Sequence, residues 1–144
     1  MNINTDVLLK RLCHSSTIDG FLSRNQDELA APDFVGAITR LCIDRQVPPE
    51  KVINKANIER SFGHQIFRGR RRPSRDVIIQ LAFGFESSVD ETQTLLKLAG
   101  ASALYPRVKR DAVILFCIHK GYGLIDTQIM LSDLSLPLLG CNPK

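Results

Sequence analysis

The chain has 144 residues, of which 44% are hydrophobic and 24% are charged, and its formal net charge is +4 at pH 7. These proportions exclude an intrinsically disordered protein and are typical of a folded domain with a core of its own. The sequence lacks the run of roughly 18 apolar residues that a membrane-spanning helix needs, and it does not open with a cleavable signal pattern. We therefore expect a cytoplasmic protein without membrane association.

Cysteine and histidine usage argues against a metal site and against an enzyme. No two cysteines form the Cys-x-x-Cys pair that zinc sites usually need; the four are Cys13, Cys42, Cys117 and Cys141. The three histidines are far apart, and no Gly-x-Ser-x-Gly, Walker-loop or His-Glu-x-x-His pattern occurs. We expect a protein that is not an enzyme and that holds no metal and no other cofactor.

The N-terminal third carries weak helical patterns. Residues Thr5–His14 and Thr17–Leu29 have apolar side chains at helical spacing, and Ala31-Pro32 interrupts them. We predict a helical extension over residues 1–32. The stretch Asp33–Gln46 is a clearer amphipathic helix, because its apolar side chains recur on a single face.

A helix-turn-helix follows. Pro49 or Glu50 begins a short helix that ends near Ala56, and Asn57 then tolerates the positive φ that a compact turn between helices needs. A second helix is predicted over Glu59–Phe67, with Gly69 placed to terminate it.

Four more helices complete the chain. Ser74 is a good N-cap for a helix through Phe85, and Ser88 with Glu91 forms a capping box for a helix that stops at Gly100. Two further helices are predicted over 107–119 and 124–134. No segment alternates with period two, and we expect no internal repeat. The prediction is an all-α bundle of five to eight short helices, with 33–100 as the helix-turn-helix domain and 101–144 as a helical pair that packs on it or mediates dimerisation.

Five arginines fall within eight residues, directly after the predicted second helix of the turn: Arg68, Arg70, Arg71, Arg72 and Arg75. A basic patch of this kind suits nucleic acid, an anionic membrane surface or an acidic protein partner. Its place beside two helices that meet at a tight turn favours double-stranded DNA, with the arginines neutralising phosphates.

These residues also carry a family resemblance. The stretch from Pro49 to Phe85 reads PEKVINKANIERSFGHQIFRGRRRPSRDVIIQLAFGF, and it resembles the Cro/repressor-type helix-turn-helix family, also called XRE. Ile58 and Gly69 are eleven residues apart, as in that family. With ETQTLLKLAG and LYPRVKRDAVI further on, roughly 34–134 looks like a group of such regulators common in Gram-positive bacteria.

The resemblance implies that the helix 59–67 enters the major groove and that side chains near its start read base edges. The matching positions here are Glu59, Arg60, Ser61 and Gln65, with His64 beside them. Two positions depart from the family pattern. Gly63 stands where an apolar core residue is usual, and we expect it to weaken the helix by about 0.5–1 kcal/mol relative to alanine. Phe67 stands where a glutamate is usual, so we expect the end of this helix to pack differently.

Two hypotheses about partners remain. The first is a sequence-specific transcription regulator that binds duplex DNA as a homodimer, because one short helix reads only a few base pairs. The second is an adaptor or antitoxin-like module that binds a protein instead of DNA. The C-terminal helices are a possible contact for either kind of protein partner. In the first of them, Asp111 is placed to pair with Arg107 at i, i+4.

Overall fold

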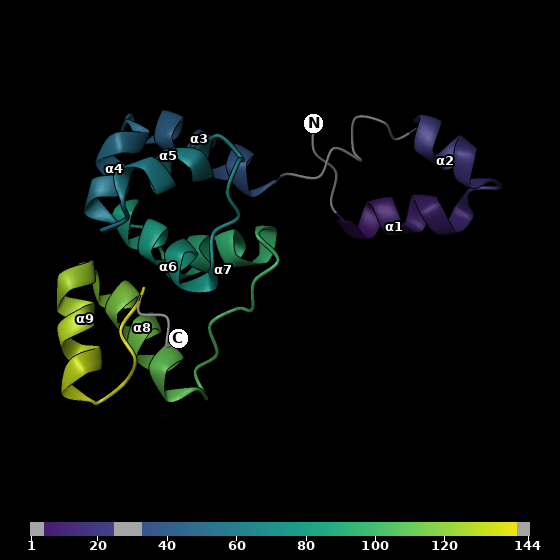
Figure 1. The fold of residues 1–144 in the computed structure, drawn as a ribbon. Coiled ribbons are helices and arrows are strands. Elements are labelled where there is room, and N and C mark those ends of the chain that lie inside the picture. The colour runs from purple at the N-terminus through teal and green to yellow at the C-terminus, as the bar shows by residue number, and fades with distance from the viewer. Residues whose placement is uncertain (1–4, 25–32, 141–144) are drawn as a thin grey trace. The chain divides into compact units, whose positions relative to one another are not determined.

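A computed structural model describes residues 5–24 and 33–140, and every regular element in these ranges is a helix, which confirms the all-α class. The chain divides into two compact units, Met1–Pro32 and Asp33–Lys144 (Figure 1). None of the helices within 5–24 and 33–140 has the length and the apolar character to cross a membrane.

In the first unit, the described residues 5–24 form two short helices, α1 (Thr5–His14) and α2 (Ile18–Arg24). Thr17 begins α2, because its hydroxyl accepts a hydrogen bond from the Gly20 amide at 3.0 Å. Phe21 is buried, whereas most of the large apolar side chains are exposed: Val7, Leu9, Leu12, Ile18 and Leu22. The predicted second helix extended to Leu29, and its last residues lie outside the described ranges.

Residues 33–140 of the second unit form seven helices, and each lies within a few residues of its predicted position. They are α3 (Phe34–Asp44), α4 (Pro49–Lys55), α5 (Arg60–Phe67), α6 (Arg75–Gly84), α7 (Val89–Leu98), α8 (Lys109–Lys120) and α9 (Leu124–Asp133). The predicted caps of α6 and α7 are confirmed. Ser74 accepts from the Val77 amide, and Ser88 forms a capping box with Glu91.

Most of these helices end in the same way. A residue with positive φ follows the last turn, and the next amide bonds back to a carbonyl near the helix end. Asn57 has φ 55° and is followed by the bond from the Ile58 amide to the Ile53 carbonyl, 3.2 Å. The positive φ of Asn57 was expected, and Gly69, with φ 75°, ends α5 as predicted. Because each such ending turns the chain within a few residues, α4 packs on α5, α6 on α7 and α8 on α9.

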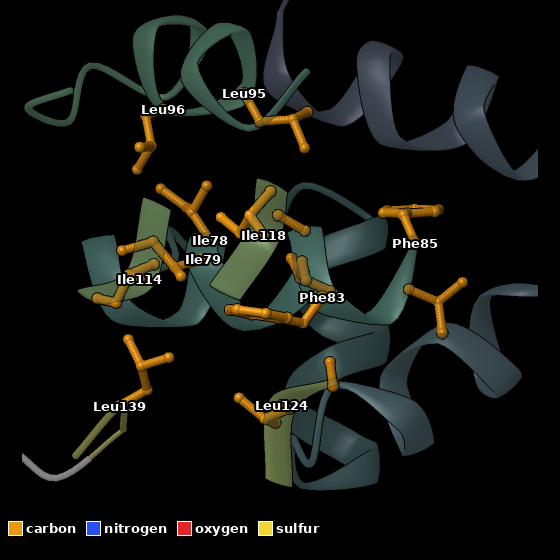
Figure 2. Close-up of a cluster of buried hydrophobic side chains, with 14 of the residues drawn as sticks. Ile78, Ile79, Phe83, Phe85, Leu95, Leu96, Ile114, Ile118, Leu124 and Leu139 are labelled. Carbon is orange, nitrogen blue, oxygen red and sulfur yellow. The ribbon is translucent and has the colours of Figure 1, made fainter. Parts of the chain in front are cut away.

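The core of the second unit surrounds α6. Seven consecutive residues of this helix, from Ile78 to Gly84, are buried. Figure 2 shows Ile78, Ile79 and Phe83 among side chains from several other elements: Leu95, Leu96, Ile114, Ile118, Leu124 and Leu139. Helices α8 and α9 therefore complete the same core that α3–α7 begin.

The last four helices form two hairpins with matching structures. Residues 110–139 lie 35 positions after their counterparts, residues 75–104, so that Arg110 corresponds to Arg75 and Leu139 to Leu104. An Arg-Asp pair opens the first helix of each hairpin, and a Thr-Gln pair lies in each second helix.

The hydrogen bonds repeat at the same spacing. The Gln93 side chain donates to the carbonyl of Leu104 and accepts from its amide, both at 2.8 Å. Gln128 makes the same two bonds to Leu139, also at 2.8 Å. Each glutamine thereby closes the loop that follows its own hairpin.

Reciprocal ion pairs join the hairpins. Asp111 accepts paired hydrogen bonds from Arg75, at 3.2 and 2.8 Å, and Asp76 accepts them from Arg110, at 3.0 and 2.9 Å. Each arginine also donates to two carbonyl oxygens of the loop after its own hairpin, those of Ser102 and Ala103 for Arg75 and those of Pro137 and Leu138 for Arg110. Such reciprocity is characteristic of an approximate two-fold arrangement.

The prediction that the chain has no internal repeat is therefore wrong. Few residues are identical between the hairpins, and different apolar residues occupy matched core positions. Ala82 corresponds to Cys117, and Phe83 to Ile118, and all four are buried. The repeat is preserved in hydrogen bonds and burial more than in residue identity.

Candidate nucleic-acid interface

Helix α5 begins at a cap made by Glu59. The Glu59 carboxylate accepts hydrogen bonds from the amides of Ser61, 2.9 Å, and Phe62, 2.8 Å. These bonds favour the charged form, and they lower the pKa of the Glu59 carboxyl, that from Phe62 most strongly. Glu59 was predicted to contact a base, but in the structure its carboxylate binds the start of its own helix.

Helix α5 is fixed against α4 by a close contact at Gly63. A β-carbon at this position would lie 2.5 Å from Cγ2 of Ile53, a buried side chain. The glycine thus explains one departure from the family pattern, because only a residue without a side chain lets the two helices approach so closely. Phe67, the other departure, packs with its ring centre 6.4 Å from that of Phe85.

Replacing Gly63 by alanine is expected to destabilise the protein by about 1–3 kcal/mol, because the added methyl overlaps Ile53. The higher helix propensity of alanine, about 1 kcal/mol, opposes this loss without cancelling it. Urea unfolding measures the change. Combining Gly63→Ala with Ile53→Ala tests the cause, since the two losses should then be less than additive. Strict additivity would contradict the packing explanation.

The outer side of α5 carries the remaining predicted base contacts. Arg60 and Ser61 are exposed, and His64 and Gln65 are half-buried. Arg60 ion-pairs with Glu50 of α4 at 2.9 Å, but both side chains are more than half exposed, so this pair contributes little stability and is easily exchanged. The Gln65 side-chain oxygen accepts a hydrogen bond from Arg71 at 3.0 Å, which leaves its amide group to donate.

Four of the five predicted phosphate contacts form an exposed group, which we call the arginine loop: Arg68, Arg70, Arg71 and Arg72. Gly69 ends α5 and turns the chain, with the Arg70 amide bonded to the Gln65 carbonyl at 2.9 Å. Within residues 5–24 and 33–140, no carboxylate lies at ion-pair distance from any of the four guanidinium groups.

The fifth predicted phosphate contact is corrected. Arg75 is partly buried and is held by Asp111 and by the carbonyls of Ser102 and Ala103, so four of its five N–H donors are occupied. The expected pairing of Asp111 with Arg107 is wrong for the same reason. The sequence did contain a signal for this arrangement, because Arg-Asp recurs 35 residues later at Arg110.

Another partly buried arginine, Arg45, is also neutralised. It follows α3 and forms paired hydrogen bonds with Glu91, at 2.6 and 2.7 Å, and it also donates to the Phe85 carbonyl. Burial acts to raise the pKa of the Glu91 carboxyl, but the bonds from the Ser88 amide and from Arg45 outweigh it, so this pKa is lowered. Glu91 therefore stays charged and keeps Arg45 paired.

Among the residues with described positions, no group of three or more histidine, cysteine, aspartate or glutamate side chains is arranged to hold a metal ion.

No protein-family model, no curated protein and no solved structure matches the chain.

Proposed function

We propose that the chain is a sequence-specific transcription regulator that binds double-stranded DNA, with α5 in the major groove and the arginine loop on the phosphate backbone. The observation that supports this most directly is the separation of two kinds of arginine. Arg45, Arg75 and Arg110 are partly buried and paired with carboxylates of the fold. The arginine loop is exposed and lacks such partners in the part of the chain that the structure describes.

The arginine loop supplies affinity in this proposal. Each guanidinium that neutralises a phosphate releases condensed counterions, which gives binding that weakens steeply with salt. These contacts position the protein on the duplex and carry little sequence information. Their place directly after α5 lets them hold the two backbones that border the groove in which α5 lies.

The exposed start of α5 supplies specificity. Arg60 is suited to paired hydrogen bonds with guanine, and Gln65 to those with adenine. Ser61 and His64 are short enough to contact a base or a phosphate near the same groove edge. Glu59 acts indirectly, because its carboxylate holds the first amides of the helix and thereby fixes where Arg60 and Ser61 begin.

We further propose that the chain acts as a homodimer in the cytoplasm. An eight-residue helix spans only a few base pairs, and regulators with such helices gain affinity and specificity by reading two half-sites.

Selection of duplexes from a random pool tests the function, and it is expected to enrich one short motif. Arg60→Ala and Gln65→Ala should each relax the preference at one position of that motif by roughly tenfold to a hundredfold, since a paired base contact is worth about 1–3 kcal/mol. Lys51→Ala, an exposed change on the neighbouring helix α4, is the control and should leave the motif unaltered. A pool that yields no motif and no duplex binding would favour the adaptor hypothesis.

A further inference from the structure

Helix α9 presents two isoleucines to solvent. Ile125 and Ile129 stand one turn apart on the same face, with 76% and 54% of their surface exposed. Buried isoleucines stabilise a fold, but these two contribute little to the core of their own chain. An exposed apolar stripe of this kind is characteristic of a contact with another molecule.

The internal repeat provides a comparison for this stripe. The residues 35 positions earlier, on α7, are Asp90 and Thr94, and they too are exposed. The same hairpin is thus built with polar side chains at these two positions in one copy and with isoleucines in the other. Because the fold does not require apolar residues there, Ile125 and Ile129 point to a role outside the fold.

The stripe borders a groove of about 780 Å³ between α9 and the end of α4. One wall carries Lys55 and Asn57, and the other carries Asp126 beside the two isoleucines. Lys55 also pairs with Glu86 at 2.5 Å, and its ammonium retains further donors. The α4 wall therefore carries a positive charge, and the α9 wall carries a negative charge beside its apolar side chains.

We infer that this surface, Ile125 and Ile129 with the walls formed by Lys55 and Asp126, binds the same surface of a second copy of the chain. A two-fold contact brings each isoleucine stripe onto its equivalent and lets Lys55 of one copy meet Asp126 of the other. The surface is self-complementary in this sense, which a one-sign patch would not be.

The inference rests on the proposed function for the choice of a second copy as the occupant. Asn57, on one wall of the groove, is the turn residue between α4 and α5. A contact at this wall therefore fixes the two recognition helices of a dimer relative to each other, which reading two half-sites requires.

Sedimentation equilibrium at micromolar concentration tests the inference in the absence of DNA. The full chain is expected to show about twice its mass of 16.1 kDa. The variant Ile125→Asp with Ile129→Thr introduces the residues of the first copy, and it should raise the dimer dissociation constant at least about a hundredfold. Circular dichroism and thermal melting should show an unchanged fold, because α7 carries these residues already.

Ile43→Asp is the matched control, since Ile43 on α3 is 71% exposed and lies outside the groove. It should leave the dimer intact. If the unchanged protein has the mass of a single chain, the inference is overturned, and the stripe would bind a different protein instead. A double variant that remains dimeric overturns the inference as well.

The outcome is separable from that of the proposed function. If the double variant binds duplex DNA and still dimerises, the proposed dimer surface is refuted and the proposed function stands. Loss of the dimer in the double variant, together with an unchanged protein that binds no duplex, supports the surface and refutes the function.

Discussion

Removing Arg70 and Arg72 together is expected to weaken binding to every duplex by roughly a hundredfold at low salt. It should also make the dependence of log affinity on log salt less steep by about 2, because about one unit of slope is lost with each phosphate contact. Arg71 is retained in this variant because it also bonds to Gln65, and its loss would alter α5 itself. Fluorescence anisotropy with a labelled duplex at several salt concentrations measures both quantities.

A charge-matched control separates local contact from net charge. Arg40→Ala with Lys120→Ala removes two positive charges from the exposed surfaces of α3 and α8. This control should change the salt slope much less than the removal of Arg70 and Arg72 does. If both double variants bind as the original chain does, the arginine loop does not contact phosphate and the regulator proposal loses its main support.

The second large effect concerns the ion pairs between the hairpins. Arg75→Met should destabilise the protein by about 3–5 kcal/mol, because it leaves the carboxylate of Asp111, whose side chain is 5% exposed, without its cation. Combining Arg75→Met with Asp111→Leu should recover most of this loss, since the buried charge is then removed together with its partner. Urea unfolding monitored by circular dichroism gives the free energies.

Two comparisons sharpen this test. Arg110→Met should cost a similar amount, because Arg110 makes the equivalent set of bonds to Asp76, Pro137 and Leu138. Arg40→Met, at an exposed position, should change stability by no more than about 0.5 kcal/mol. A cost for Arg75→Met as small as that of Arg40→Met would show that the pair is dispensable for folding.

The sequence predicted the local features of this protein well. Asn57 and Gly69 have the positive φ that their residue types favour, and Ser74 and Ser88 cap the helices that follow them. Each of these features depends on residues within one turn of chain, so a short stretch of sequence is enough to predict it.

Features that depend on distant partners were predicted poorly. Arg75 looked like one more cation of a basic run, but its partner Asp111 lies 36 residues away and only the fold brings them together. Gly63 looked like a weak point in a helix, whereas its reason is the side chain of Ile53 on the neighbouring helix. Glu59 is a local exception, because its carboxylate caps α5 through the amides of Ser61 and Phe62, and this role was missed when Glu59 was predicted to contact a base.

The ion pairs between α6 and α8 have a consequence for dissecting the molecule. They attach the first turn of α6, where the arginine loop ends, to the C-terminal hairpin, and Ile114 and Leu139 fill the adjoining core. A fragment cut after Gly100 would retain the entire helix-turn-helix motif, yet Arg75 and Asp76 would lose their counterions and α6 would lose part of its apolar cover. Residues 33–140 should therefore melt in one cooperative transition. We expect that the helix-turn-helix motif does not fold on its own as a shorter fragment of this chain.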